Sequence, residues 1–249
     1  MYVTASEASP LPLSKPPIVS STVMEGAENY YRWQFDVMAS HLGQRIIEIG
    51  CGVGEFTRLL LGREKVVSVD IEPTAIEYAR RRLAHAPNWE GIVGDAADEQ
   101  LSTLLAPYRC DSVTALNVVE HIEDDRHALR ILRRLLPVGG TVVVLVPAHQ
   151  WLYGSFDAQV GHYRRYDRQE LAAKMDEAGF TVDRILYFNM IGAVGWYVNY
   201  RILRRSSVSK GTVPQVQLFD RCLVPAARRL ERAIVPRFGL SVIGLGTAR

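Results

Sequence analysis

Short apolar runs alternate with segments of helical periodicity along most of this chain. Five runs, most of them rich in Val and Ile, lie at residues 45–49, 66–70, 89–94, 110–116 and 141–147. Four segments with helical patterns separate them, at residues 55–62, 73–85, 98–106 and 124–136. Strands that alternate with helices over short connections form a parallel sheet, and right-handed crossovers place helices on both faces. The pattern predicts an α/β fold with a doubly wound, mostly parallel sheet.

A helix is predicted before the first strand. Residues 25–40 carry Tyr31, Phe35 and Met38 at helical spacing. The preceding residues, 1–24, are rich in Pro and Ser and lack the apolar core of a signal peptide. We expect them to form a disordered leader.

Two further strands are expected after the alternating part. Asp167 and Glu170 have the spacing of a capping box, which would open a helix over 168–178. The stretch TVDRILYF then predicts a sixth strand, and GLSVIGLGT predicts the last one. Between them, residues 190–238 form a largely helical insertion that could serve as a lid. Residues 25–249 therefore constitute one domain.

Composition narrows the class of protein. A hydrophobic fraction of 48% and a charged fraction of 22% are typical of a soluble globular protein. Its three cysteines, Cys51, Cys110 and Cys222, form no C-x-x-C pair, so neither a disulfide framework nor a zinc site is expected. We expect a cytoplasmic protein that requires no metal.

The C-terminal part is basic and aromatic. Residues 191–249 contain ten Lys or Arg residues and only two acidic residues. Such a basic segment can bind phosphate groups or an anionic membrane surface, or it can simply form a solvent-exposed helical face. The stretch 185–203 is apolar, but Asn189 and Arg201 interrupt it, so it is too short to span a bilayer. Peripheral membrane contact through 185–205 stays open.

The stretch IIEIGCGVG, residues 46–54, is the strongest indication of a ligand site. A strand delivers Glu48 and then three glycines at alternate positions: Gly50, Gly52 and Gly54. Glycines allow positive φ and let a ligand lie against bare backbone. Dinucleotide binding in dehydrogenases uses G-x-G-x-x-G, whereas here the third glycine comes one residue early and Glu55 takes its place. A carboxylate at a helix N-terminus repels pyrophosphate and suits a ligand with a cationic end.

The E-x-G-x-G-x-G pattern resembles the first motif of class I S-adenosylmethionine (SAM) methyltransferases, and the likeness runs over about residues 28–189. The resemblance implies a Rossmann-like sheet of seven strands, with the antiparallel seventh strand inserted between the fifth and sixth. It also implies SAM as cofactor and S-adenosylhomocysteine as product. The positions that match the family's cofactor site are Tyr30, Glu48, Gly50, Cys51, Gly52, Gly54, Asp70, Ile71, Asp95, Ala96 and Asn117.

The roles implied for these positions follow the ends of the strands. Asp70, twenty residues after Gly50, would accept hydrogen bonds from both ribose hydroxyls. Asp95 would accept a bond from the adenine amine, with the Ala96 amide on a ring nitrogen. Asn117 would face the amino-acid end of the cofactor.

Two histidines are candidates for catalysis. An oxygen acceptor must lose its proton during methyl transfer, so a base near the methyl group is expected. His121, in VVEHIED, follows the fourth strand, and His162 lies in the loop 147–167 after the fifth. Asp157 could orient the His162 imidazole. His149 is a weaker third candidate.

The same loop carries a second prediction. Arg164 and Arg165 flank His162 at the end of the sheet where the acceptor should arrive, and they could bind an anionic acceptor in bidentate fashion. Alternatively, the loop is simply held together by its own hydrogen bonds.

The sequence thus favours a SAM-dependent methyltransferase acting on a small molecule. Oxygen in a natural product, glycan or lipid-linked compound is the expected acceptor, with nitrogen or carbon as alternatives. A NAD-dependent oxidoreductase and a non-catalytic interaction protein of the same fold remain rivals. A nucleic-acid substrate is not expected, because no N-P-P-[YF] motif occurs. The oligomeric state is left open.

Overall fold

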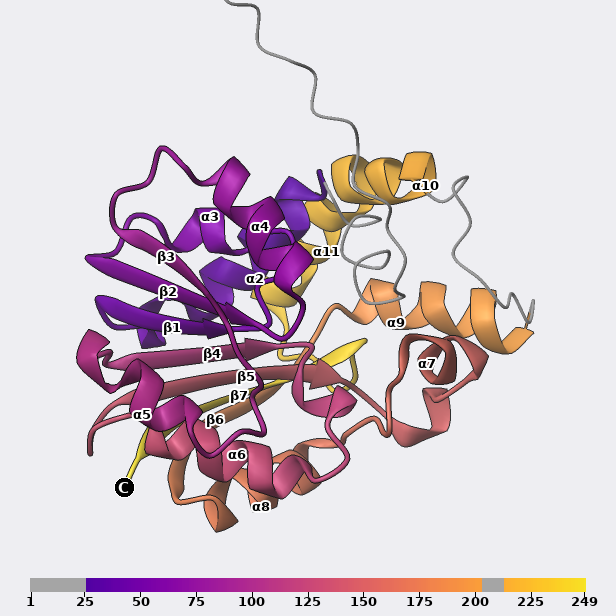
Figure 1. The fold of residues 1–249 in the computed structure, drawn as a ribbon. Helices are drawn as coiled ribbons and strands as arrows, with labels where there is room; N and C mark the ends of the chain where they lie inside the picture. The colour runs from indigo at the N-terminus through magenta and orange to yellow at the C-terminus, as the bar shows by residue number, and fades with distance from the viewer. Residues whose placement is uncertain (1–25, 203–212) are drawn as a thin grey trace, which may run out of the picture.

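The computed structural model describes residues 26–202 and 213–249 (Figure 1). The predicted leader at 1–24 lies outside the described residues, and so does the middle of the predicted insertion.

A single sheet of seven strands forms the centre of the described structure. The strands are β1 (Arg45–Ile49), β2 (Lys65–Asp70), β3 (Trp89–Val93), β4 (Ser112–Leu116), β5 (Thr141–Pro147), β6 (Phe180–Phe188) and β7 (Ser241–Ala248). Their order is β3-β2-β1-β4-β5-β7-β6, and β7 pairs antiparallel with both β5 and β6 while the other pairs are parallel. The predicted Rossmann-like, mostly parallel sheet of seven strands is confirmed.

Helices cover both faces of the sheet, as Figure 1 shows. On one face lie α2 (Glu28–Met38), α3 (Thr57–Leu60), α4 (Pro73–Arg82) and α11 (Val224–Ala233). On the other lie α5 (Leu101–Leu105), α6 (Asp125–Arg134) and α8 (Arg168–Glu177). Successive strand residues point to opposite faces, yet Ile46 and Ile47 are both buried, because apolar helix faces cover each side.

Two helices are shorter than the periodicity predicts. The helix expected at 55–62 is reduced to α3. Gly52 and Gly54 have positive φ, which is not helical, so the chain is still in a turn just before the helix begins at Thr57. The helix expected at 98–106 is reduced to α5. The Asp95 and Asp98 carboxylates accept hydrogen bonds from backbone amides two residues ahead, which favours turns in place of a helical start.

The insertion after β6 is helical in its described parts. It contains α9 (Met190–Trp196), a π-helical turn at Tyr197–Ile202, α10 (Val213–Leu218), a second π-helical turn at Phe219–Leu223, and α11. Among the described residues, no helix combines the length and the apolar character needed to cross a bilayer. In Figure 1, α9 and the short helix α7 (Ser155–Val160) lie beyond the C-terminal ends of the parallel strands.

Asp220 in this insertion caps the N-terminal helix. Ala27 precedes α2 and supplies no side-chain cap. The Asp220 carboxylate, 3% exposed, instead accepts hydrogen bonds from the backbone amides of Asn29 at 3.2 Å and Tyr30 at 2.8 Å. A carboxylate there satisfies amides that lack helical partners and complements the helix dipole. The two ends of the domain are therefore joined by one buried charge.

We expect Asp220→Ala to lower the free energy of unfolding by about 1–2 kcal/mol, because it removes the cap and leaves first-turn amides unpaired. Urea denaturation of the full chain measures this. Glu77→Ala, which removes an exposed carboxylate paired with Arg81 four residues along the same helix, is the control and should cost less than about 0.5 kcal/mol. Equal effects of the two substitutions would contradict the capping role.

Candidate active site

The predicted site residues gather at one edge of the sheet. Because β1, β2 and β4 are parallel, Gly50, Asp70 and Asn117 all follow or end their strands on the same side. The end of β5 at Pro147 and the end of β6 at Phe188 lie at this edge too, since β7 runs antiparallel to both. Open α/β sheets bind ligands in the crevice beyond these ends.

The glycine loop presents bare backbone at this edge. Gly50, Gly52 and Gly54 all have positive φ, at 76°, 51° and 80°. A Cβ on Gly50 would lie 2.3 Å from the Val118 Cγ2, so only glycine lets the loop approach the end of β4 this closely. Cys51 between the glycines is buried, which raises the pKa of its thiol well above the ordinary value and leaves it protonated.

Asp70 braces the glycine loop from the neighbouring strand. Its Oδ2 accepts a hydrogen bond from the Gly52 amide at 2.8 Å, and its Oδ1 accepts one from the Glu72 amide at 3.0 Å. Partial burial raises the pKa of this carboxyl, and the two amides oppose that effect. The next residue, Ile71, is 61% exposed, so an apolar surface lies open beside the carboxylate. This pairing suits a nucleoside, whose ribose hydroxyls donate hydrogen bonds and whose base is flat and apolar on its faces.

Glu48 lies beneath the loop. Its side chain is 3% exposed, and its Oε2 accepts hydrogen bonds from the hydroxyls of Thr57 and Ser68, each at 2.7 Å. Burial raises the pKa of Glu48 to about 7, against the opposing effect of those bonds. Glu48 thus joins β1, β2 and α3, and its predicted contact with the cofactor stays a prediction.

The sequence-based argument from Glu55 is wrong. This carboxylate is only 4% exposed and lies 3.0 Å from Arg82 and 3.4 Å from Arg58. Two guanidinium groups balance its charge, and α3 begins only at Thr57. It therefore provides no unpaired charge against a pyrophosphate. The spacing of the glycines remains as the difference from a dinucleotide-binding loop.

The remaining cofactor candidates lie at the same edge, though not all together. Asp95 is exposed and accepts a bond from the Ala97 amide at 2.8 Å, and Ala96 is buried behind it. Asn117 is exposed with a φ of 55°. Tyr30 packs its ring 5.8 Å from that of Phe188, so it lies on the β6 side of the edge. Burial raises the pKa of the Tyr30 phenol to about 12.

The fold brings His121 and His162 together. Their rings lie 4.6 Å apart in an edge-on arrangement, although the sequence separates them by a strand and two helices. The Tyr163 amide donates to the Glu120 carbonyl at 2.8 Å, which pins the loop after β5 against the end of β4. Burial and, to a smaller extent, the neighbouring His162 together lower the pKa of His121 to about 4, so the ring is neutral.

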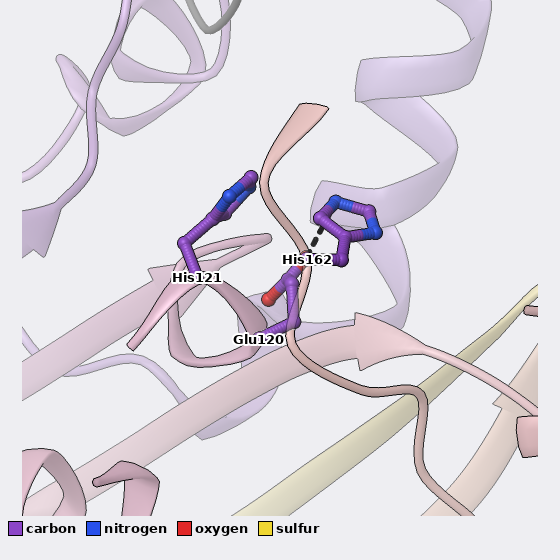
Figure 2. A group of neighbouring side chains, drawn as sticks. All are labelled: Glu120, His121 and His162. Atoms are coloured by element: carbon purple, nitrogen blue, oxygen red, sulfur yellow. Dashed lines mark ion pairs between the residues drawn. The ribbon is translucent and has the colours of Figure 1, made fainter. Parts of the chain in front are cut away.

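Asp157 orients His162 as predicted. Its Oδ1 lies 2.8 Å from the His162 Nδ1 and also accepts a bond from the Arg165 Nε at 2.8 Å. Burial alone would raise the pKa of Asp157, but the bond from His162 and the Arg165 charge hold it below its usual value. The Nε2 of His162 then points toward Glu120, whose Oε1 is 3.9 Å away (Figure 2).

Arg164 and Arg165 do not serve as open anion binders. Arg165 is 2% exposed and is held by Asp157 and the Ala148 carbonyl. Arg164 lies 2.8 Å from the Asp125 carboxylate and donates to two backbone carbonyls. The alternative prediction, that the loop is held by its own hydrogen bonds, describes these arginines correctly.

His149 lies apart from this cluster, against aromatic rings. It has a φ of 63° and stacks on Tyr187 with ring centroids 4.7 Å apart. Trp151, which is 59% exposed, lies 5.5 Å from it. His149 thus belongs to an aromatic surface beyond β5 and not to the paired histidines.

Sequence reasoning missed Glu120. Its side chain is fully buried, and among the described residues neither carboxylate oxygen has a hydrogen-bond partner. Burial raises its pKa to about 8. The signal in the sequence was its place directly before His121 in VVEH, but nothing in that order reveals whether the side chain is buried or paired.

Comparison with known proteins identifies the family. A sequence model of the methyltransferase domain matches residues 27–185, which is more than half of the chain. The chain belongs to this family. The enzyme is a SAM-dependent methyltransferase, which decides against the NAD-dependent oxidoreductase and the non-catalytic protein.

The methyltransferase has relatives among both sequences and solved structures. The ubiquinone/menaquinone biosynthesis C-methyltransferase UbiE of Cronobacter sakazakii is 26% identical over 196 residues, covering 66% of this chain and 76% of the relative. The 2-phytyl-1,4-naphtoquinone methyltransferase of Thermosynechococcus vestitus is 33% identical over 111 residues, covering 43% of this chain and 48% of that protein. The structure of a possible histamine N-methyltransferase from Thermotoga maritima has a TM-score of 0.60 at 17% identity, covering 94% of this chain and 98% of that chain. This last likeness shows the fold alone.

The buried position of Glu48 generates a prediction about pH. Its folded pKa of about 7 lies above the unfolded value of 4.5, so the folded enzyme binds more protons between those values. The free energy of unfolding therefore falls as pH rises through this window, by about 3 kcal/mol from this group. In Glu48→Gln that contribution is absent, and chemical denaturation at a series of pH values should show a flatter profile. Parallel profiles for the two proteins would show that Glu48 does not titrate in this range.

Proposed function

We propose that this methyltransferase transfers the methyl group of SAM to a hydroxyl oxygen of a small acceptor. The proposal rests on the cluster of Glu120, His121 and His162 at the end of β4, beside the glycine loop. A hydroxyl must lose its proton as its oxygen gains the methyl group, and two imidazoles with a buried carboxylate are suited to bind and polarise it. An amine that is already neutral attacks without losing a proton first, so such a nitrogen acceptor has less need of this cluster than a hydroxyl has.

The cofactor is expected at the ends of β1, β2 and β4, next to the histidine cluster. SAM supplies a methyl group on a positively charged sulfur, and the enzyme has to hold it in line with the acceptor atom. We assign the ribose to Asp70, the adenine to Ile71, Asp95 and Ala96, and the amino-acid end to Asn117 and the glycine backbone. Tyr30 is a more distant contributor, because its ring lies against Phe188.

The aromatic surface beyond β5 favours a hydrophobic acceptor. Trp151 and Tyr197 are 59% and 42% exposed, and their rings lie 5.9 Å apart, so the loop after β5 meets the insertion through them. Exposed rings on adjoining segments are typical of a surface that binds apolar or aromatic compounds. An anionic acceptor is less well supported, since Arg164 and Arg165 are occupied within the protein.

A second candidate is methylation of a ring carbon in a hydroxylated aromatic compound. It is favoured by the similarity to UbiE, which is named as a C-methyltransferase of quinone biosynthesis. Ring carbon becomes nucleophilic when a neighbouring hydroxyl ionises, so the same cluster would act on the same proton. Incubating a host extract with isotope-labelled SAM and locating the label by NMR separates the two: a label on oxygen supports the first proposal, and a label on ring carbon the second.

With an acceptor identified in this way, we expect His162→Ala to lower turnover by about 100-fold or more, because the hydroxyl loses its partner. The dissociation constant for SAM should stay within a factor of about two, since His162 serves the acceptor and not the cofactor. His85→Ala is the matched control, because His85 is exposed on the opposite edge after α4. Full turnover in His162→Ala would remove the cluster from the reaction.

For the cofactor side, we expect Asp70→Ala to weaken SAM binding by about 10- to 150-fold, or about 1.5–3 kcal/mol. The substitution removes the acceptor of the ribose hydroxyls and also leaves the Gly52 amide unpaired. Calorimetry with SAM measures it. Asp98→Ala, at an exposed carboxylate that binds the Gln100 amide, should change affinity less than about twofold. Wild-type affinity in Asp70→Ala would exclude it from the site.

A further inference from the structure

Glu120, His121 and His162 form a set of three side chains that could share one ion. One ligand atom from each lies within 4.8 Å of the others, and Figure 2 shows the side chains converging from two separate segments. Glu120 and His121 follow β4, while His162 belongs to the loop after α7. The expectation that no metal is required was based on the absence of a C-x-x-C pair. These three ligands include no cysteine, so that pattern could not predict them.

The Glu120 carboxylate is buried with only one long ion-pair contact, 3.9 Å to the His162 Nε2. It is 0% exposed, and among the described residues neither oxygen accepts a hydrogen bond. Burying such a group is unfavourable unless it is paired or binds a metal. The guanidinium of Arg165 is already bonded to Asp157 at 2.8 Å, so this neighbouring charge is balanced elsewhere. A cation between the carboxylate and the imidazoles would satisfy Glu120.

His162 is held as a metal ligand would be. Its Nδ1 bonds to the fully buried Asp157, which leaves Nε2 directed toward Glu120 at 3.9 Å. An imidazole that bonds to a carboxylate through one nitrogen and to a metal through the other is a common arrangement, because the carboxylate fixes the ring and raises its basicity. Asp157 is itself fixed by Arg165 and by the Gly154 amide.

We propose that Glu120, His121 and His162 bind one divalent transition-metal ion. Two nitrogens and one carboxylate oxygen suit Zn²⁺, Co²⁺, Mn²⁺ or Fe²⁺ better than Mg²⁺ or Ca²⁺, which prefer oxygen ligands. With bonds of about 2.1 Å, ligand atoms lie about 3–3.5 Å apart, so the side chains close by about 1 Å around the ion. Three protein ligands leave positions open for an acceptor.

This site would give the proposed O-methylation its means of removing a proton, and in that respect it rests on the proposed function. A hydroxyl bound to the ion loses its proton more readily. The proton passes to water, the oxygen forms a bond to the methyl carbon, and the carbon–sulfur bond breaks to leave neutral S-adenosylhomocysteine. Binding of the ion itself requires no acceptor and can be tested alone.

The test is a titration of the tag-free, metal-depleted full chain with Co²⁺. We expect visible absorption bands of protein-bound Co²⁺ that saturate at one ion per chain and are displaced by Zn²⁺. His121→Ala, His162→Ala and Glu120→Gln should each weaken Co²⁺ binding by about 10-fold or more. His85→Ala should bind like the wild type. Thermal unfolding of each variant shows whether it folds, and Glu120→Gln keeps the side-chain volume in case a truncated variant does not.

Failure of this proposal can be told apart from failure of the proposed function by measuring SAM binding in the same samples. Absence of Co²⁺ binding in a chain that binds SAM would overturn the metal site and leave methyl transfer intact. Co²⁺ affinity that is unchanged in all three variants would also overturn it, because the ion would then be bound elsewhere. Co²⁺ binding in a chain that transfers no methyl group to oxygen would support the site and count against O-methylation.

Discussion

Parallel pairing of β1 with β2 on one side and β4 on the other places the candidate cofactor-site residues of this methyltransferase. Strands that run in one direction release the chain at one edge, so the glycine loop, Asp70 and Asn117 meet although they are far apart in sequence. The glycines complete the arrangement, since the close approach of Gly50 to Val118 leaves no room for a side chain. The candidate cofactor site thus depends on the common direction of these strands and on glycine, which has no Cβ atom, at the position where the loop meets Val118.

Buried charges at this edge are paired, with one exception. Glu48 accepts bonds from two hydroxyls, Glu55 lies against two arginines, and Asp157 holds Arg165 and His162. Such pairs tie neighbouring segments together, because breaking one partner leaves a buried charge uncompensated. Glu120 differs from them: among the described residues its carboxyl oxygens accept no hydrogen bond, and its ion-pair contact with the His162 Nε2 is long, at 3.9 Å. Burying a carboxyl group without a hydrogen bond is unfavourable to the fold, and this is the observation behind the proposed metal site.

The helical insertion is part of the domain's framework as well as a boundary of the site. Asp220 caps α2 from a position 190 residues away, and Glu231 of α11 accepts bonds from the amides of Asn189 and Met190 after β6. On the other side, Trp196 stacks over the buried Arg165, and Tyr197 meets Trp151. The insertion therefore reaches the same loop that carries His162.

The sequence by itself determined the α/β alternation, the seven strands and the glycine loop. A strand buried on both faces appears as a short apolar run, and a loop that needs positive φ appears as a series of glycines. The sequence also suggested that Asp157 orients His162. The chain makes this contact by reversing at Gly161, whose φ is 84°, so that the His162 amide donates to the Asp157 carbonyl at 2.9 Å. Only the tertiary structure decided the partners of Glu55, Arg164 and Arg165. Only it joined His121 to His162 beside a buried Glu120 that accepts no hydrogen bond among the described residues. Those contacts depend on which strands become neighbours and which charges are buried, and these are properties of the packed chain that no local pattern contains.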